Sequence, residues 1–365
     1  MQPVLRHCLF ILVNALAILY GWAQPIATEP PAAAEQENRP HIALILPLAS
    51  PSFGRHAEAA RQGFLAAAKA QGGTDLPVIS YPVGDDPAEA LAAYKRAVDN
   101  GARVVVGPLT RDAVAALAAS DLVSVPTLAL NALDADARLP AQLYLFGLQA
   151  DTEARQVARI AFEQGRRSAL TVSDDTPLAR RLLAAFTDEF TRLGGRQQAA
   201  FAYSASPIDL NALRQAAASG NSDVVFIALD GAKTRLLRPY LGNAVPIYAT
   251  SQVASDATAP TANYELNGIR FVDMPWLLAP DHPAVMVYPR PPGGDAVPAE
   301  LERLYALGID AWRIAADLIG GHDIARAPLD GVTGRITLSS GRLFTRESMP
   351  ARYSDGKAVA GAEPQ

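Results

Sequence analysis

Cysteine is almost absent from this sequence of 365 residues, in which Cys8 is the one example. A disulfide needs two cysteines, and a zinc site built on thiolates commonly uses several of them. Because Cys8 lies ahead of the folded region predicted below, a Cys–His nucleophile in the body of the protein is excluded as well. The fold is therefore expected to rest on packing and hydrogen bonds, without covalent cross-links.

Residue patterns that signal catalysis or cofactor binding are missing too. The five histidines are scattered along the chain, without a pair at helical ligand spacing and without an HExxH motif. The chain also lacks the GxSxG turn of serine hydrolases, the GxxxxGK of phosphate-binding loops and a GxGxxG after a strand. The sequence therefore offers no motif for catalysis, and we expect no metal ion and no cofactor.

Basic residues are fewer than acidic ones. The sequence has 32 lysines and arginines against 37 acidic residues, and the formal net charge is −5. No block of clustered basic residues overrides this balance, so the sequence predicts no binding to nucleic acid. Half of the residues are hydrophobic and 19% are charged, which is typical of a folded soluble protein. At about 150 residues per domain, the length predicts roughly two domains.

The first 23 residues have the three-part layout of a secretory signal peptide. Basic residues precede an apolar run over 8–20, and the small residues Gly21 and Ala23 mark a cleavage site after Ala23. The run is shorter than the roughly 20 apolar residues that a bilayer span needs. A lipid-attachment cysteine should follow such a run, whereas Cys8 stands at its start. The predicted product is an exported, periplasmic protein whose membrane association is only indirect.

Residues 24–40 connect this signal peptide to the folded body. The segment holds four prolines and shows no apolar periodicity, which is typical of an extended, flexible tether. The folded body is therefore predicted to begin at His41.

Strands and helices alternate through most of the body. Short, nearly continuous apolar runs mark strands that are buried on both faces, and amphipathic stretches of about 10–15 residues separate them. The pattern restarts near Asp151, which predicts two α/β lobes, each a doubly wound parallel sheet, joined by a hinge. The predicted strands are 41–48, 77–83, 102–106, 125–130, 143–148, 168–173, 199–203, 223–229 and 246–250.

The last third of the chain is less regular. Residues 269–278 have the pattern of an apolar strand, and 299–319 that of a long amphipathic helix. Short strands and turns are predicted over 332–359. Met274 and Trp276 lie within the predicted strand, either as exposed anchors that contact a protein partner or as part of the buried core.

Polar residues follow several predicted strands, at the edge where α/β sheets bind their ligands. In the turn 107–110, glycine permits close approach, and the next helix directs free N–H groups towards a carboxylate or phosphate. The alternative is an ordinary tight turn in which Thr110 caps the helix. If the two lobes face each other, the strand ends line one cleft for a small molecule. The candidate cleft residues are Ser52, Phe53, Gly107, Leu109, Thr110 and Asn131 in the first lobe, and Asp174, Asp230, Thr250 and Ser251 in the second.

Two pairs of carboxylates also follow predicted strands, Asp85–Asp86 and Asp174–Asp175. Paired carboxylates at such a position suit metal binding or acid–base chemistry. The favoured interpretation is that Asp86 caps the helix beginning at Pro87, and that the second pair precedes its helix in the same way.

Several strings along the body resemble one protein family. In order they are VVVGPLTRDAV (104–114), VPTLALN (125–131), LYLFGLQADTEARQVA (143–158), VPIYATS (245–251), GIRFVDMPWLL (268–278), RLYALGIDAWRI (303–314) and LDGVTGRITL (329–338). MPWLL followed by YALGIDAW is the most specific combination among them. The strings resemble the penicillin-binding-protein activator family of the LpoA/LppC type, which has the type I periplasmic-binding-protein fold.

This resemblance implies a non-enzymatic binding module that stimulates a class A bifunctional peptidoglycan synthase by protein–protein contact in the periplasm. It also implies that the chain passes between its lobes three times, near residues 148, 272 and 331. On that basis lobe 1 comprises 41–147 plus 273–331, lobe 2 comprises 148–272 plus 332–358, and 359–365 is a C-terminal tail.

Two features depart from the best-known members of that family. Those proteins are outer-membrane lipoproteins, whereas the one cysteine here is misplaced for lipid attachment. They also carry a large helical-repeat domain at the place where this sequence has the tether of residues 24–40.

The second hypothesis is a periplasmic solute-binding protein that delivers an amino acid or similar small anion to an ABC transporter. Such a protein needs a polar cleft between the lobes and a hinge that closes on the ligand. The 107–110 turn would bind a carboxylate and Asp230 an ammonium group, although Pro108 removes one N–H from that turn. A hydrolase that uses Asp174 or Asp175 is a third hypothesis, which the missing nucleophile, base and metal motifs disfavour.

Overall fold

The computed structural model describes residues 38–361, apart from residues 73 and 340 and the segments 134–137, 255–259, 295–296 and 322–326. The predicted signal peptide and residues 24–37 of the predicted tether lie outside the described residues, as do the last four residues of the predicted tail. From Asn38 onward the chain forms one compact unit.

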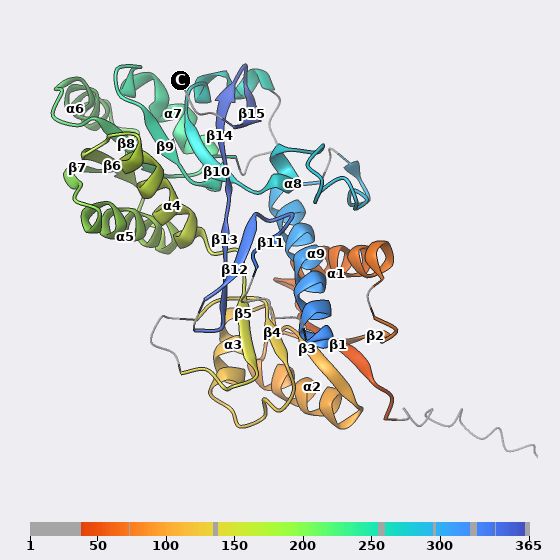
Figure 1. The fold of residues 1–365 in the computed structure, drawn as a ribbon. Helices are drawn as coiled ribbons and strands as arrows, with labels where there is room; N and C mark the ends of the chain where they lie inside the picture. Colours follow the sequence, from red (N-terminus) through yellow and green to blue (C-terminus); the bar gives the residue numbers. More distant parts are fainter. Residues whose placement is uncertain are drawn as a thin grey trace, which may run out of the picture. The chain divides into compact units, whose positions relative to one another are not determined.

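Within the described residues, the first sheet has eight strands in the order β11-β12-β13-β5-β4-β3-β1-β2 (Figure 1). Strands β1 to β5 are parallel to their neighbours, as βαβ units require. Strand β13 adds to β5 in parallel, and β11, β12 and β13 pair antiparallel. The elements are β1 (His41–Leu46), α1 (Gly54–Gln71), β2 (Val78–Pro82), α2 (Pro87–Asp99), β3 (Ala102–Val106), α3 (Arg111–Ala118), β4 (Thr127–Ala129), β5 (Leu143–Phe146), β11 (Leu329–Asp330), β12 (Arg335–Leu338) and β13 (Leu343–Glu347).

The second sheet of the described chain has seven strands in the order β15-β14-β10-β9-β8-β6-β7. Strands β6 to β10 are parallel, and β14 and β15 add to β10 as an antiparallel hairpin. The elements are α4 (Ala150–Glu163), β6 (Ser168–Ser173), α5 (Pro177–Arg192), β7 (Arg196–Ala202), α6 (Pro207–Ala218), β8 (Val224–Ala228), α7 (Gly231–Leu241), β9 (Ile247–Ala249), the 3₁₀ turns Ser251–Ala254 and Pro260–Leu266, β10 (Arg270–Asp273), β14 (Met349–Ser354) and β15 (Lys357–Ala360). The helices α8 (Pro275–Leu278) and α9 (Ala299–Gly320) follow β10 in the chain, and α9 packs in the core of the first lobe. Two doubly wound sheets are the fold class that the sequence predicted, and the prediction is confirmed.

Strand β1 shows why its sequence is an unbroken apolar run. Ile42 and Leu44 belong to a core cluster with residues of α1 and α9, whereas Ala43 and Ile45 belong to a cluster with residues of α2 and α3. Because successive side chains of a strand point to opposite faces, helices on both faces require apolar residues at every position.

Two boundary predictions in the last third are corrected by the structure. The strand predicted over 269–278 ends at Asp273, because Pro275 cannot donate a ladder hydrogen bond and instead begins the short helix α8. The third passage between the sheets, predicted near 331, lies instead between β13 and β14, since residues 335–347 pair within the first sheet. Alternating strand residues suit either sheet, so the pattern could not place this hairpin.

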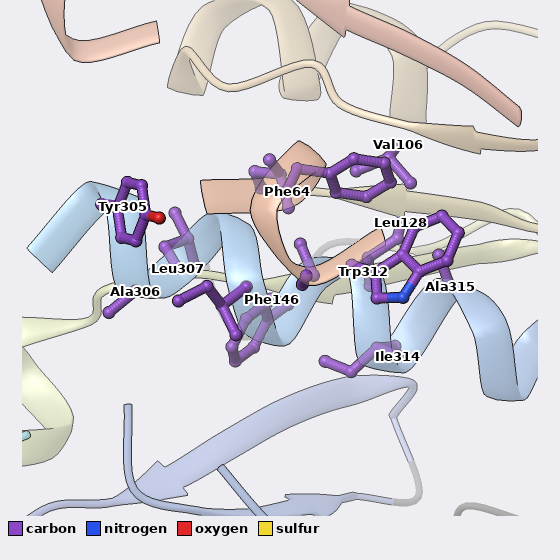
Figure 2. Close-up of a cluster of buried hydrophobic side chains, with 14 of the residues drawn as sticks. Phe64, Val106, Leu128, Phe146, Tyr305, Ala306, Leu307, Trp312, Ile314 and Ala315 are labelled. Atoms are coloured by element: carbon purple, nitrogen blue, oxygen red, sulfur yellow. The ribbon is translucent and has the colours of Figure 1, made fainter. Parts of the chain in front are cut away.

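Helices α1 and α9 pack so closely that glycine is required on both. A Cβ atom on Gly63 would lie 1.8 Å from the Tyr305 carbonyl oxygen, and one on Gly308 would lie 2.0 Å from that of Ala60. Around this contact, Figure 2 shows Phe64 next to Trp312, whose rings meet edge to face with their centroids 5.3 Å apart. The first-lobe core therefore depends on two helices from opposite ends of the sequence.

Candidate functional site

The structure buries both residues that were candidates for contact with a protein partner. Met274 is 1% exposed and Trp276 is fully buried. The Trp276 indole N–H donates to Glu302 Oε2 at 3.0 Å, and the Arg290 guanidinium lies 4.2 Å from the centre of its ring. Side chains enclosed in this way present no surface to a partner, so the docking-anchor alternative for Met274 and Trp276 is wrong and the buried-core alternative is confirmed.

The turn after β3 holds three of the first-lobe candidates, Gly107, Leu109 and Thr110, and a fourth, Asn131, contacts it. Gly107 has a φ of 106°, and its Cα lies so close to the Ile45 carbonyl that a Cβ would be 1.9 Å from that oxygen. The Asn131 side chain donates through Nδ2 to the Leu109 carbonyl oxygen at 2.8 Å. Thr110 is at the N-cap position of α3 but makes no capping hydrogen bond.

Ser52 and Phe53 lie in the turn that precedes α1. Their backbone N–H groups donate to the Ser50 hydroxyl at 3.1 and 2.7 Å, and the Phe53 ring is 46% exposed. The hydroxyl of Ser50 thus shapes this turn, and Phe53 is left as a surface residue.

The carboxylates of Asp174 and Asp230, in the second lobe, both contact Lys233. The sequence had not indicated this lysine as a site residue. Lys233 Nζ donates to Asp174 Oδ2 at 2.5 Å and lies 3.4 Å from Asp230 Oδ2. Asp230 also caps α7, because its Oδ1 accepts from the Lys233 backbone N–H at 2.8 Å. The cavity beside this cluster, of about 300 Å³, is lined by residues of the second lobe alone. The chain therefore supplies its own ammonium group at the position where a ligand ammonium was expected.

The capping interpretation of the carboxylate pairs holds in the first case and fails in part in the second. Asp86 caps α2 by accepting from the Ala88 N–H at 2.8 Å. The cap of α5 is Thr176, whose hydroxyl accepts from the Ala179 N–H, while Asp174 accepts from Thr176 and Lys233.

The Lys233→Met variant is expected to raise the pKa of Asp174. Burial favours the neutral carboxyl, but the hydrogen bonds from Lys233 and Thr176 outweigh burial and hold the pKa of Asp174 below its usual value. A lowered folded-state pKa contributes stability above the unfolded-state pKa, and this stability is lost as the pH falls through the folded-state value. In the variant the folded-state pKa of Asp174 lies closer to its unfolded-state value, so the free energy of unfolding should be lower near pH 7 and should fall less on acidification. Urea unfolding curves between about pH 3 and pH 7 measure this difference.

Lys95→Met is the matched control for this prediction. Lys95 Nζ contacts Asp99 Oδ2 at 2.8 Å, but the two side chains are 66% and 59% exposed. Such a surface pair contributes less than about 1 kcal/mol, so the free energy of unfolding should change little at any pH. If the free energy of unfolding of Lys233→Met fell with decreasing pH by as much as that of the wild type, the coupling between Lys233 and Asp174 would be contradicted.

The structure reveals a set of buried polar groups where the chain passes between its sheets. We call it the hinge network. Arg346 on β13 donates through Nη2 to Glu153 Oε1 on α4 at 2.6 Å, which joins an element of the first sheet to a helix of the second lobe. Arg303 on α9 donates through Nη2 to Asp273 Oδ2 at 2.6 Å. The network comprises Glu153, Gln156, Ser251, Asp273, Arg303, Arg346 and Ser348, all of them buried.

Backbone groups complete the hinge network. The Gln156 side chain donates through Nε2 to the Ser348 carbonyl at 2.7 Å and accepts from the Ser348 N–H at 2.9 Å. The Ser251 N–H donates to Glu153 Oε2 at 3.1 Å, and the Ser251 carbonyl accepts from Arg303 Nη2 at 3.2 Å. Ser251 and the buried Thr250 are therefore enclosed at the hinge rather than displayed in an open cleft.

Burial and pairing act in opposite directions on the pKa of Arg303. Burial alone would lower the pKa of Arg303, but the Asp273 carboxylate outweighs it, so the pKa is raised and the side chain stays charged. Removing one partner of either pair leaves a buried charge unpaired, which lowers the free energy of unfolding. A movement that separates α4 from β13 has to break the Glu153–Arg346 pair and both Gln156–Ser348 hydrogen bonds, so the network opposes hinge opening.

A family model, LppC, described as a putative lipoprotein, matches residues 23–356 of this chain. The chain belongs to this family. The match spans all seven strings on which the predicted resemblance depended, and that prediction is confirmed. Among curated relatives, the penicillin-binding protein activator LpoA of Yersinia pseudotuberculosis is 29% identical over 333 residues, covering 78% of this chain and 50% of the relative. LpoA of Haemophilus influenzae is 27% identical and covers 89% of this chain and 56% of the relative.

This LppC-family chain thus spans about half the length of the curated relatives it matches. One similar solved structure, described as "a putative branched-chain amino acid ABC transporter from Chromobacterium violaceum", is 38% identical with a TM-score of 0.73 and covers 86% of this chain and 100% of that one. The C-domain of LpoA from Haemophilus influenzae, described as "a regulator of PBP1A", is 24% identical with a TM-score of 0.72 and covers 88% and 100%. The shared architecture is the type I periplasmic-binding-protein fold that the sequence predicted.

A cavity of about 580 Å³ lies beside the hinge network of this LppC-family protein. Its walls come from α4, β9, β10 and β14, together with residues around β11 and β12. Arg270 and Arg335 line it with Glu163 and Glu347, so its walls carry both signs of charge. None of the predicted cleft residues lines this cavity. Its walls come from positions far apart in the sequence, and a local sequence pattern does not indicate which distant positions come together.

The described residues contain neither a metal-ligand cluster nor a membrane-spanning helix. No group of three or more histidine, cysteine, aspartate or glutamate side chains is placed to hold a metal ion. No described helix combines the length and the apolar character that crossing a membrane requires.

Proposed function

We propose that this protein is a non-enzymatic periplasmic regulator of cell-wall synthesis that stimulates a class A bifunctional peptidoglycan synthase by direct contact. Membership of the LppC family and the similarity to curated LpoA activators over 78–89% of the chain support this proposal. The partner class is inferred from the names of those relatives, since the chain corresponds to about half of their length.

The structural observation that carries the proposal is the hinge network. A solute-binding protein opens and closes about its hinge to admit and enclose a ligand. Here the Glu153–Arg346 and Asp273–Arg303 pairs, both buried, oppose that motion. A module of fixed shape suits a docking role, in which the surface presented to a partner is formed in advance.

The proposal is tested by adding the purified full chain to the class A synthase of the same organism. Rates of glycan polymerisation and of peptide cross-linking are followed as the concentration of the protein is raised, with serum albumin as the control. A saturable rise in either rate is expected. Unchanged rates, together with no binding between the two purified proteins, would reject the activator role.

A second candidate function is solute binding for an ABC transporter. The observation in its favour is the description of the Chromobacterium violaceum structure, which is 38% identical to this chain. Against it, the Lys233 ammonium already contacts the Asp174 and Asp230 carboxylates that would bind an amino acid. We therefore expect leucine, isoleucine and valine to leave the thermal midpoint unchanged; a saturable rise with any of them would favour the transporter role.

A further inference from the structure

A second charged cavity lies at the end of the second sheet where its parallel strands begin. This end is opposite to the one that holds Asp174 and Asp230. Its volume is about 360 Å³. Arg166 precedes β6, Pro246 precedes β9 and Arg270 is the first residue of β10, whereas Asp174 and Asp230 follow the carboxyl ends of β6 and β8. The cavity is therefore separate from the carboxylate cluster. It is lined by Arg166, Arg238, Asn243, Ala244, Val245, Pro246, Ile247, Asn267, Gly268 and Arg270.

Three arginine residues line this cavity, one of which, Arg270, also lines the 580 Å³ cavity, and none of the described lining residues is acidic. Arg238 donates through Nη1 to the Gly242 carbonyl at 2.6 Å and through Nη2 to Asn243 Oδ1 at 2.6 Å. A longer hydrogen bond of 3.3 Å joins Arg238 Nη2 to the Asn267 carbonyl. All of these acceptors are neutral, so Arg238 has no hydrogen bond to a carboxylate.

Arg270 is held in the same manner. It donates through Nη1 to Gln164 Oε1 and to the Tyr248 hydroxyl, both at 2.8 Å. These contacts fix the orientation of the guanidinium without neutralising its charge.

Arg166 has the least satisfied side chain of the three. Its Nε is buried and has no hydrogen-bond partner, and the described residues provide none for the rest of its guanidinium. The Nε of Arg238 is likewise buried and unpaired. Buried donors of a charged group normally have acceptors, and their absence marks a position where an acceptor from outside the chain would be stabilised.

We propose that this cavity is a binding site for a small oxyanion, namely a phosphate, sulfate or carboxylate group. A planar guanidinium group can donate two hydrogen bonds to one such anion, and three arginines line this cavity together with two asparagines. Burial lowers the pKa of Arg238, and Glu265 opposes this through its charge alone. A bound anion would compensate the same burial from inside the cavity. This site does not depend on the proposed activator function.

The test measures binding of inorganic phosphate to the purified full chain by calorimetry and by the thermal midpoint. Ionic strength is kept constant with sodium chloride, because screening alone changes the stability of a charged protein. Sulfate and acetate are titrated in the same way. A saturable heat and a concentration-dependent rise in the midpoint are expected with at least one of the three anions.

Arg166→Gln is the decisive variant, because this side chain makes no hydrogen bond to the described residues and its replacement should not disturb folding. The affinity for the anion is expected to fall at least about tenfold, since a charge-assisted donor is lost. Arg214→Gln, on the exposed face of α6, removes the same charge away from the cavity and should leave the affinity unchanged. No saturable binding of any of the three anions would overturn the proposal, as would equal affinity in wild type and Arg166→Gln.

Discussion

Arg346→Met is expected to lower the free energy of unfolding by about 3–5 kcal/mol, the cost of leaving a buried charge without its partner. The Arg346 and Glu153 side chains are both 4% exposed, and the pair is 2.6 Å long. Without Arg346, Glu153 keeps the Ser251 N–H as a donor but loses its cation. Urea unfolding followed by circular dichroism measures the change.

The double variant Glu153→Gln, Arg346→Met distinguishes the cost of an unpaired buried charge from the cost of losing the contact itself. Glutamine can still accept from the Ser251 N–H, and no net charge remains in the interior, so most of the lost stability should return. Arg181→Met is the surface control, because its pair with Asp151 is 51% and 39% exposed and contributes less than about 1 kcal/mol. Equal losses in Arg346→Met and Arg181→Met would show that the hinge network does not hold the lobes.

Gly308→Ala is expected to destabilise the protein by about 3 kcal/mol, at the upper end of the usual cost of overpacking. The added methyl would lie 2.0 Å from the Ala60 carbonyl oxygen and 2.7 Å from the Phe64 nitrogen, both of them backbone atoms. Helices α1 and α9 would have to separate, which loosens the packing of Phe64 against Trp312. Alanine is better than glycine in a helix by about 1 kcal/mol, and this gain reduces the loss without reversing it.

Gly341→Ala provides the comparison for this substitution. A Cβ there meets only the Ser339 hydroxyl, at 3.9 Å, and the backbone does not need a positive φ. The free energy of unfolding should stay within about 1 kcal/mol of wild type. If Gly308→Ala were equally mild, the two helices would not be in the close contact described above.

The amino-acid pattern was informative wherever structure depends on neighbouring residues. Apolar runs separated by amphipathic stretches predicted the parallel strands of both sheets, and Asp86 followed by Pro87 predicted a capped helix that the structure contains. Short strands over 332–359 were predicted as well, but the assignment of 332–347 to the second lobe was wrong, because short alternating strands suit the edge of either sheet. Only the structure separated the two alternatives for Trp276, because a tryptophan beside a proline has the same sequence whether it is exposed or buried.

The candidate site residues likewise divide into those that the sequence indicated and those that only the structure revealed. Asp174 and Asp230 were identified from their places at strand ends, but Lys233, which forms an ion pair with both, lies 59 residues from Asp174. The arginines around the 360 Å³ cavity come from three separate segments, and each alone has the pattern of a solvated helix or strand end.

By itself, then, the sequence determined the alternation of strands and helices, the two-lobed α/β class and the family, because these depend on local periodicity and on strings of adjacent residues. Only the tertiary structure decided that the hinge is held by buried charges, since Glu153 and Arg346 are 193 positions apart and either residue alone has an ordinary surface pattern. Folding brings such charges out of water, where an ion pair interacts far more strongly than it does on the surface. The state of the hinge, and with it the choice between a fixed module and a closing one, is therefore a property of the folded chain.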